Sequence, residues 1–247
     1  MIPAASLKAI LRTDALRLQR DRFLMGMGAY IIGVALALRF ALPWISTELH
    51  LRAGFDLQPW LPLMSSHFVV GLAGLLAGII GGFMLLESRE ERTIKAMLVS
   101  PLPLSHYVAV VATVVLVTAT LLGVAQGLLL SVALPPLIAL LAISLAAAPT
   151  AVLMALFIST FADTKIEAMV LMKVCAMFPL VPTGCYFLPE PWQWVGAWHP
   201  SWWAAKAYWM AEAGSGPWAL FAAGAAIPAT LWLGLLVRAF IRAAHRT

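Results

Sequence analysis

The residues best suited by type and spacing to do chemistry lie in one charged segment between two long apolar stretches. Residues 87–103 read ESREERTIKAMLVSPLP. At helical spacing, three apolar residues share one face: Ile94, Met97 and Leu98. Three acidic residues present another face: Glu87, Glu90 and Glu91. Pro101 and Pro103 would end a helix. The pattern predicts a short amphipathic helix with a docking face; a loop charged for solubility would explain only the charges.

The rest of the sequence offers little for catalysis. It contains no GxxxxGK[ST] phosphate-binding loop, no HExxH and no GxSxG, so we do not expect this chain to hydrolyse ATP by itself. The five histidines are scattered at unrelated spacings, and Cys175 and Cys185 form no CxxC pair. We therefore expect no catalytic residue, cofactor or metal ion on this chain, and both cysteines to be small buried side chains.

Lys173 is the one charge deep inside an apolar segment. An intramembrane cation is costly and marks a candidate functional site. Two interpretations remain open. The side chain reaches toward the cytoplasmic surface, as lysine often does, or it faces a pore or substrate groove together with Glu167, two turns earlier.

Glycines crowd one segment at a spacing typical of close helix packing. Gly74, Gly78 and Gly82 form two successive GxxxG patterns. Such a stripe lets another helix approach closely. The partner is either a helix of the same chain or a second copy across a dimer.

The composition predicts an all-α integral membrane protein with a single transmembrane domain over residues 1–247. The chain is 62% hydrophobic, its mean hydropathy is +0.92, and only 11% of its residues are charged, against about 25% in soluble domains. Ten-residue segments of alternating hydrophobicity, typical of β-barrels, are absent. About 20 apolar residues cross a bilayer as a helix, which gives six predicted spans at about 23–45, 61–86, 105–132, 137–160, 166–188 and 218–237.

The basic residues predict how the chain is oriented. Twelve lie on one side of the predicted spans: Lys8, Arg12, Arg17, Arg20, Arg22, Arg89, Arg92, Lys95, Lys165, Arg238, Arg242 and Arg246. Three lie on the other side: Arg39, Arg52 and Lys206. By the positive-inside rule, both termini and residues 87–103 are cytoplasmic, in a bacterial plasma membrane. The net charge of +5 therefore reflects membrane topology and contact with lipids, not nucleic acid.

Two further segments are expected to lie in or near the membrane without forming a continuous spanning helix. Residues 5–21 alternate leucines with basic residues, which predicts an amphipathic helix in the cytoplasmic interface; a basic flank that only sets topology is the alternative. The fifth span is expected to break near Pro179–Pro182. Seven of the ten tryptophans follow it between Trp192 and Trp218, which predicts a re-entrant or interfacial element before the sixth span.

The charged segment resembles the signature of type-two ABC exporter permeases, including those of the multidrug and fluoroquinolone type. That family follows its second span with a glutamate-rich run, Thr, an apolar turn, Ser-Pro-Leu and Tyr. The matching residues are Glu87, Glu90, Glu91, Thr93, Leu98, Ser100, Pro101, Leu102 and Tyr107. FADTKIEAMVLMK, from Phe161, is similar to the beginning of the family's fifth span. Arg92 stands where the family usually has Gly, and Val110-Val111 where it often has Gly-Lys.

The resemblance implies a function for residues 87–103. In such permeases this segment is a coupling helix that docks on a separate ATP-binding subunit, which holds ATP and Mg. The expected docking residues are Glu87, Glu90, Glu91, Arg92, Thr93, Ile94, Met97 and Leu98. A second permease, identical or not, would complete the transport path, and the substrate would be an amphipathic or hydrophobic drug, antibiotic, lipid or peptide.

Two other function classes fit the sequence less well. An ion-coupled secondary transporter would need acidic residues inside its spans, and the predicted span interiors have none. An intramembrane enzyme would need paired catalytic groups at membrane depth. Only scattered histidines and Lys173 are available for that purpose.

Overall fold

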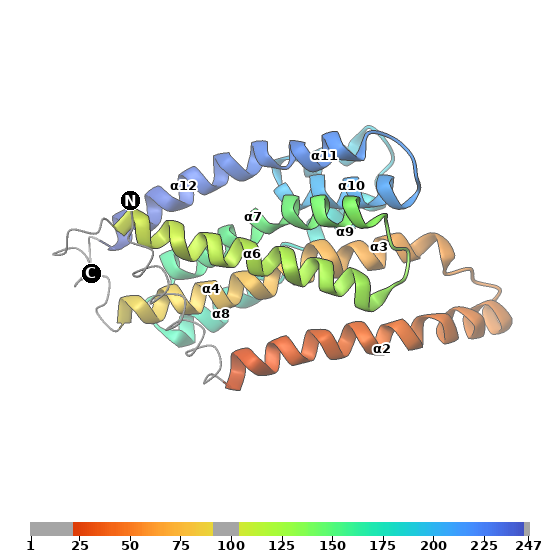
Figure 1. The fold of residues 1–247 in the computed structure, drawn as a ribbon, viewed down its shortest axis with the longest axis horizontal. Coiled ribbons are helices and arrows are strands. Elements are labelled where there is room, and N and C mark those ends of the chain that lie inside the picture. The colour runs from red at the N-terminus through yellow and green to blue at the C-terminus, as the bar shows by residue number, and fades with distance from the viewer. Residues whose placement is uncertain (1–21, 91–103, 245–247) are drawn as a thin grey trace.

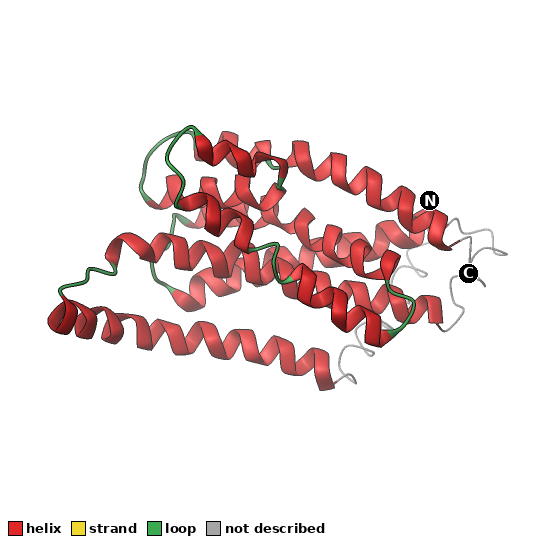
Figure 2. Cartoon of the chain, turned by 180° about the vertical axis from the view of Figure 1, so that it is seen from behind, coloured by secondary structure: helices red, strands yellow, loops and turns green. Residues whose placement is uncertain are grey.

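The computed structural model describes residues 22–90 and 104–244, and every regular element in these ranges is helical (Figure 1, Figure 2). The elements are α2 (Arg22–Ala53), the 3₁₀ turn η1 (Gln58–Trp60), α3 (Leu61–Ser66), the π-helical η2 (His67–Leu72), α4 (Ala73–Glu90), α6 (Leu104–Leu130), α7 (Leu137–Phe161), α8 (Lys165–Cys175), α9 (Leu180–Tyr186), the 3₁₀ helix η3 (Trp192–Trp198), α10 (Pro200–Glu212), α11 (Trp218–Gly224) and α12 (Ala226–Ala244). The predicted interfacial helix at 5–21 lies outside the described residues.

The prediction of an all-α membrane protein with six spans is confirmed. Six helical stretches in the described ranges are long and apolar enough to cross a membrane: Gly28–Ala53, Gln58–Ser88, Tyr107–Leu130, Leu137–Phe161, Lys165–Tyr186 and Trp218–Ala243. The largest difference is in the first span, which the sequence ended near residue 45. Pro43 does not break α2, so the helix continues through Glu48 and Arg52, which form an i,i+4 ion pair of 2.6 Å.

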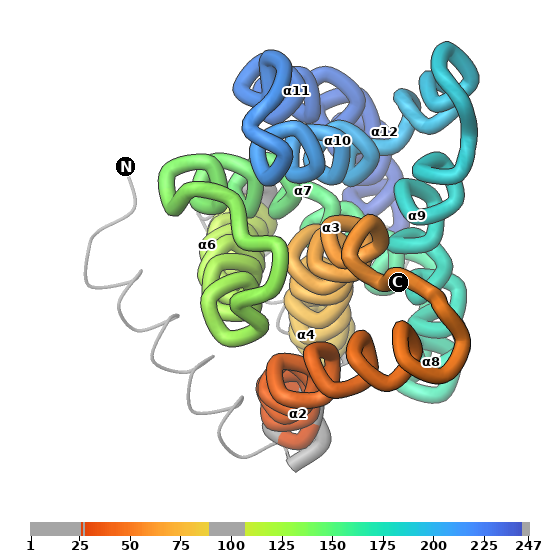
Figure 3. The backbone as a smooth tube through the Cα atoms, turned by 90° about the vertical axis from the view of Figure 1, so that its right-hand side faces the viewer, coloured from red at the N-terminus to blue at the C-terminus, as the bar shows by residue number. Residues whose placement is uncertain are grey.

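The second span forms the centre of the bundle. In its most apolar stretch 89% of the residues are buried, against 17% in the first span. Seen along the bundle, α4 lies in the middle with α6 and α8 on either side and α7 behind it, while α2 lies apart at the edge (Figure 3). The α4–α7 contact is the most extensive between any two described helices, and α2 contacts mainly α6. Any element that moves α4 therefore acts on most of the molecule.

The fifth span is broken, as the prolines predicted, although the break lies slightly earlier than residues 179–182. α8 ends at Cys175, a turn follows, and α9 begins after Pro179. Proline has no backbone N–H to donate, so Pro179 cannot continue the hydrogen-bond ladder of α8. Pro182 lies in the first turn of α9, where a missing N–H costs little.

The segment after α9 is re-entrant, as predicted. η3 turns back into the molecule, and α10 then runs outward beside α11 (Figure 1). The depth of the turn is shown by Trp198, whose carbonyl accepts a 3.0 Å hydrogen bond from Nε1 of Trp232, near the middle of the sixth span. The tryptophans are not all interfacial: Trp202 is fully buried in the core, whereas Trp192 is 67% exposed.

Candidate functional site

The first part of the candidate site is the base of the charged segment, at the end of the bundle where α4 ends and α6 and α8 begin. The Glu87 side chain on α4 accepts a 2.6 Å hydrogen bond from Nζ of Lys165, the first residue of α8. The two side chains are 25% and 51% exposed. An ion pair at this exposure contributes at most about 1 kcal/mol to stability, so its main effect is to link the end of the second span to the start of the fifth.

A second link at the same end joins α4 to α6. Ser88 is buried; its Oγ lies 3.0 Å from the Met84 carbonyl oxygen and 2.6 Å from the hydroxyl of Tyr107. Tyr107 belongs to the family motif. Ser88 carries no feature that would have singled it out in the sequence, because its partner is 19 residues away and becomes a neighbour only when α4 and α6 pack.

The charged segment itself continues beyond these links. α4 extends to Glu90, so the first charged residues lie on the span helix and do not begin a new element. The other predicted docking residues, Glu91, Arg92, Thr93, Ile94, Met97 and Leu98, lie outside the described residues, as does the predicted amphipathic helix. The described structure shows what holds the two ends of this segment.

The start of α8 is set by a local capping motif. Oγ1 of Thr164 accepts the backbone N–H of Glu167 at 3.3 Å, and Oε2 of Glu167 accepts the backbone N–H of Asp163 at 2.8 Å. This is a variant of the capping box, and the sequence TKIE carries its signature. The motif fixes the direction in which α8 leaves the end of α7, and so positions Lys165 against Glu87.

The second part of the candidate site is a groove of about 580 Å³ between α2, α4 and α8. Lys173 lines it from α8, opposite Tyr30 and Ile31 of α2 and Leu75 and Ile79 of α4. The volume falls within the range of about 300–1,000 Å³ that is usual for small-molecule sites. Glu167, expected beside Lys173, does not line the groove and instead caps α8. Lys173 therefore supplies the charge at a wall that is otherwise nearly all apolar.

Two of the three glycines of the stripe, Gly78 and Gly82, face another helix of the same chain. A Cβ added at Gly78 would lie 2.8 Å from the Ala151 carbonyl oxygen of α7, and one at Gly82 would lie 3.0 Å from Cβ of Ile158. Gly74 differs, because a Cβ there would meet nothing within 4 Å. Gly81, which the spacing did not include, approaches α6 so closely that its Cβ would lie 2.3 Å from a methyl group of Val115.

Metal-binding and thiol chemistry find no support in the described ranges. Residues 22–90 and 104–244 contain no group of three or more potential metal ligands. Cys175 and Cys185 are buried free thiols, in line with their interpretation as packing residues.

Comparison with known proteins identifies the family. Residues 14–237 match the family model described as fluoroquinolones export permease protein Rv2686c-like. The chain is 30% identical over 208 residues to the fluoroquinolones export permease protein Rv2686c of Mycobacterium tuberculosis strain H37Rv, which covers 82% of this chain and 81% of that protein. The same figures hold for the fluoroquinolones export permease protein MT2760 of strain CDC 1551. The resemblance to ABC exporter permeases is thus confirmed, and the chain belongs to the Rv2686c-like family of fluoroquinolones export permeases.

Proposed function

We propose that this chain is the membrane-spanning subunit of an ATP-driven exporter that works by alternating access. Separate ATP-binding subunits would bind ATP and Mg, because the sequence has no nucleotide-binding loop of its own. A second permease would complete the transport path. The end of the bundle that holds Glu87, Lys165 and Arg238 would face the cytoplasm, in a bacterial plasma membrane. These assignments are based on the family membership and on the topology predicted from the basic residues.

The observation that carries the proposal is the connection from α4 to α8. Residues 91–103 leave α4 and return in α6, and the Glu87–Lys165 ion pair joins that point to α8. Lys173 lies eight residues further along α8, which is about 12 Å at 1.5 Å per residue. A force applied to the coupling segment would therefore reach the groove through one continuous helix.

The groove suggests the kind of substrate. Its wall of leucine and isoleucine side chains suits an apolar body, and the Lys173 ammonium suits an anionic group on that body. The relatives are named for fluoroquinolones. We propose that this chain exports amphipathic aromatic molecules with a carboxylate, of which fluoroquinolones are one class.

A partner subunit changes the state of the permease only if it binds the two states with different affinity. The proposed differential contact is the coupling segment, where Ile94, Met97 and Leu98 supply an apolar docking face and Glu90 and Glu91 supply charge that sets partner choice. The exposed apolar residues of α8, among them Met169, Val170 and Val174, form a surface that the second permease would cover.

The test uses the complex of the permease with its ATP-binding subunit in liposomes. Changing Glu91→Ala and Ile94→Ala together should abolish most of the substrate-stimulated ATPase activity while the permease remains folded. Glu48→Ala is the matched control, because Glu48 is a glutamate at the opposite end of the bundle. Full stimulation in an assembled Glu91→Ala/Ile94→Ala complex, or failure of any ATP-binding subunit to co-purify, would contradict the proposal.

A further inference from the structure

The second and the fifth span both depart from a regular α-helix, and their irregular segments lie against each other. In the second span this segment is the π-helical η2, and in the fifth it is the turn 176–179 between α8 and α9. A Cβ added at Gly71 of η2 would lie 2.7 Å from Cβ of Pro179, closer than real Cβ atoms approach. Because π-helical and 3₁₀ segments inside longer helices often mark functional sites and hinges, this contact joins two candidate hinge segments.

The turn between α8 and α9 is held by short-range backbone hydrogen bonds. The N–H of Phe178 donates to the Cys175 carbonyl at 3.0 Å, and the N–H of Val181 donates to the Phe178 carbonyl at 3.2 Å. Bonds that span three residues have poorer geometry than those of an α-helix. Pro179 has no N–H with which to make the α-helical bond. The turn therefore resists bending less than the helices on either side of it.

On one side of the turn, α9 is tied to the second span. Oγ1 of Thr183 donates to the Pro179 carbonyl at 3.1 Å. Because a hydroxyl has one proton, the same Oγ1 accepts from Nδ1–H of His67 in η2, at 3.1 Å. The hydroxyl of Tyr186, the last residue of α9, donates to the Pro59 carbonyl at 3.1 Å. Hydrogen bonds thus fix both ends of α9 to the half of the second span that lies away from Glu87.

On the other side of the turn, α8 packs through apolar contacts and has a largely exposed outer face. Ala168 and Cys175 are fully buried in a cluster with residues of α4 and α7. Ile166 and Val170 on the outer face are 77% and 57% exposed. Apolar contacts have no preferred direction, unlike hydrogen bonds. α8 is therefore held in a way that permits it to tilt, whereas α9 is not.

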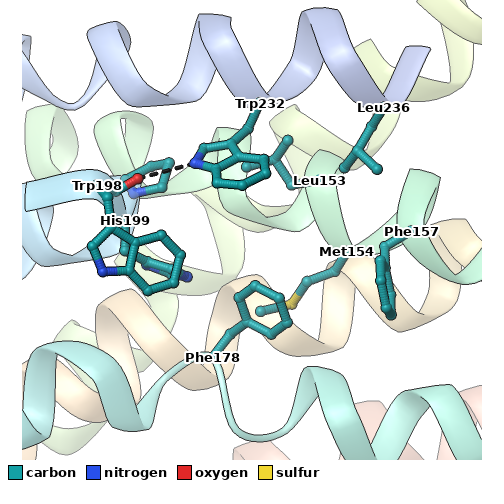
Figure 4. A pocket seen from close by; sticks show the side chains of 9 residues that line it. Leu153, Met154, Phe157, Phe178, Trp198, His199, Trp232 and Leu236 are labelled. Carbon is teal, nitrogen blue, oxygen red and sulfur yellow. Dashed lines mark hydrogen bonds between the residues drawn. The ribbon is translucent and has the colours of Figure 1, made fainter. Parts of the chain in front are cut away.

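The turn adjoins open space in two directions. The Phe178 side chain points from the turn into an apolar cavity of about 200 Å³ in front of α7 (Figure 4). Its ring lies 6.4 Å from that of Phe157 and 5.3 Å from that of His199. Ala176, in the same turn, lines the groove of about 580 Å³ that contains Lys173. The turn therefore has room to move both toward α7 and toward α2.

We infer that α8 rotates as a rigid helix about Pro179, which is seated on Gly71, while α9 stays fixed to the second span. The inference deepens the proposed function and rests on it, because the rotation would change the width of the Lys173 groove as the coupling segment moves. α8 has 11 residues and is about 16 Å long, so a rotation of about 15° would move its Lys165 end by about 4 Å.

The test measures distances between spin labels on the full-length permease in lipid nanodiscs by double electron–electron resonance. One label is attached at Ile166→Cys on α8 or at Gly184→Cys on α9, and the other at Leu121→Cys on α6, all exposed positions. Cys175→Ala and Cys185→Ala remove the native thiols. We expect the α8–α6 distances to spread over a range about 4 Å wider than the α9–α6 distances, as the rotation of a helix of this length requires.

Pro179→Ala tests the hinge directly. Alanine keeps the Cβ that contacts Gly71 and adds an N–H that can donate to the Cys175 carbonyl, which would join α8 to α9. The α8–α6 distribution should narrow to the width of the α9–α6 distribution. Substrate-stimulated ATPase activity of the complex should fall several-fold. Pro149→Ala is the matched control, because it replaces a proline inside the continuous helix α7, and it should change neither quantity.

Two outcomes would overturn the inference. The first is equal width of the α8–α6 and α9–α6 distributions in the permease with native Pro179, which needs no partner subunit and decides the question even if Pro179→Ala does not fold. The second is a folded Pro179→Ala permease whose α8–α6 distribution stays broad. Absence of substrate-stimulated ATPase activity in the complex with native Pro179 would instead contradict the proposed function, and the two widths would still decide whether the hinge exists.

Discussion

The two sides of α4 differ in how closely another helix approaches. On the side of α7, the Cβ-free surface of Gly78 and Gly82 lies directly against backbone and Cβ atoms of α7. On the side of α2 and α8, large side chains such as Leu75 and Ile79 line a groove of about 580 Å³. The first side leaves no room to move without a clash, whereas the second already contains space. For the proposed alternating access, we therefore expect α4 and α7 to move as one body and the rearrangement to take place at the groove.

The largest expected effect comes from breaking the tight side. Gly78→Ala places a Cβ 2.8 Å from the Ala151 carbonyl oxygen and 2.8 Å from Cβ of Met154, both of which belong to another helix. Overpacking of this kind destabilises by about 1–3 kcal/mol. The apparent Tm of the purified permease, followed by size-exclusion chromatography after heating, should fall.

Gly74→Ala is the control for that substitution, because a Cβ at position 74 meets nothing within 4 Å. Alanine is favoured over glycine in a helix by about 1 kcal/mol, so this variant should be unchanged or slightly more stable. Equal destabilisation by Gly74→Ala and Gly78→Ala would show that the close approach to α7 is not what matters.

An intermediate effect is expected on the open side. Lys173→Gln removes the charge from the groove wall without creating a cavity. A hydrogen bond to a charged group contributes about 1.5–3 kcal/mol, so transport of an anionic amphipathic substrate should weaken roughly tenfold or more. Vesicle uptake assays measure this change, and the Tm should stay unchanged.

Lys173→Arg keeps the charge and should retain most of the transport. If Lys173→Gln transports anionic and neutral analogues with unchanged relative affinity, the lysine does not contact the substrate. The groove would then contact the substrate only through its apolar side chains.

The smallest effect is expected from changing the Glu87–Lys165 ion pair, which links α4 to α8. Reversing the pair with Glu87→Lys and Lys165→Glu together should restore most of the coupling that either single change reduces by a few-fold. The expected change in stability is below about 1 kcal/mol, because both side chains are partly exposed. Substrate-stimulated ATPase activity of the reconstituted complex is the measurement. A double variant no better than the singles would show that the ion pair does not transmit motion.

Local patterns predicted much of the fold. The six apolar stretches gave the spans because the bilayer requires about 20 apolar residues per helix, and the prolines near 179–182 gave the break in the fifth span. Proline alone was not sufficient to locate breaks, because Pro43 and Pro149 lie inside continuous helices. Each of those helices contains one proline, whereas the fifth span contains two within four residues, Pro179 and Pro182.

The candidate site was predictable only in part. Lys173 was singled out because a charge at membrane depth is unusual, but its groove depends on α2 and α4, which are distant in sequence. Lys165 and Thr164 were missed, although TKIE carries a capping signature. The role of Ser88 could not be read from its neighbours, since Tyr107 reaches it only through packing.

The sequence by itself determined the membrane class, the number of spans and the family, because hydropathy and the charged motif are properties of short contiguous segments. Only the tertiary structure decided which glycines touch another helix, which helix start pairs with Glu87, and which residues surround Lys173 and His199. Each of these facts depends on which helices become neighbours and on how they are rotated about their axes. In an apolar solvent, hydrophobic periodicity carries little information about that rotation, so close packing and a few polar contacts set it instead.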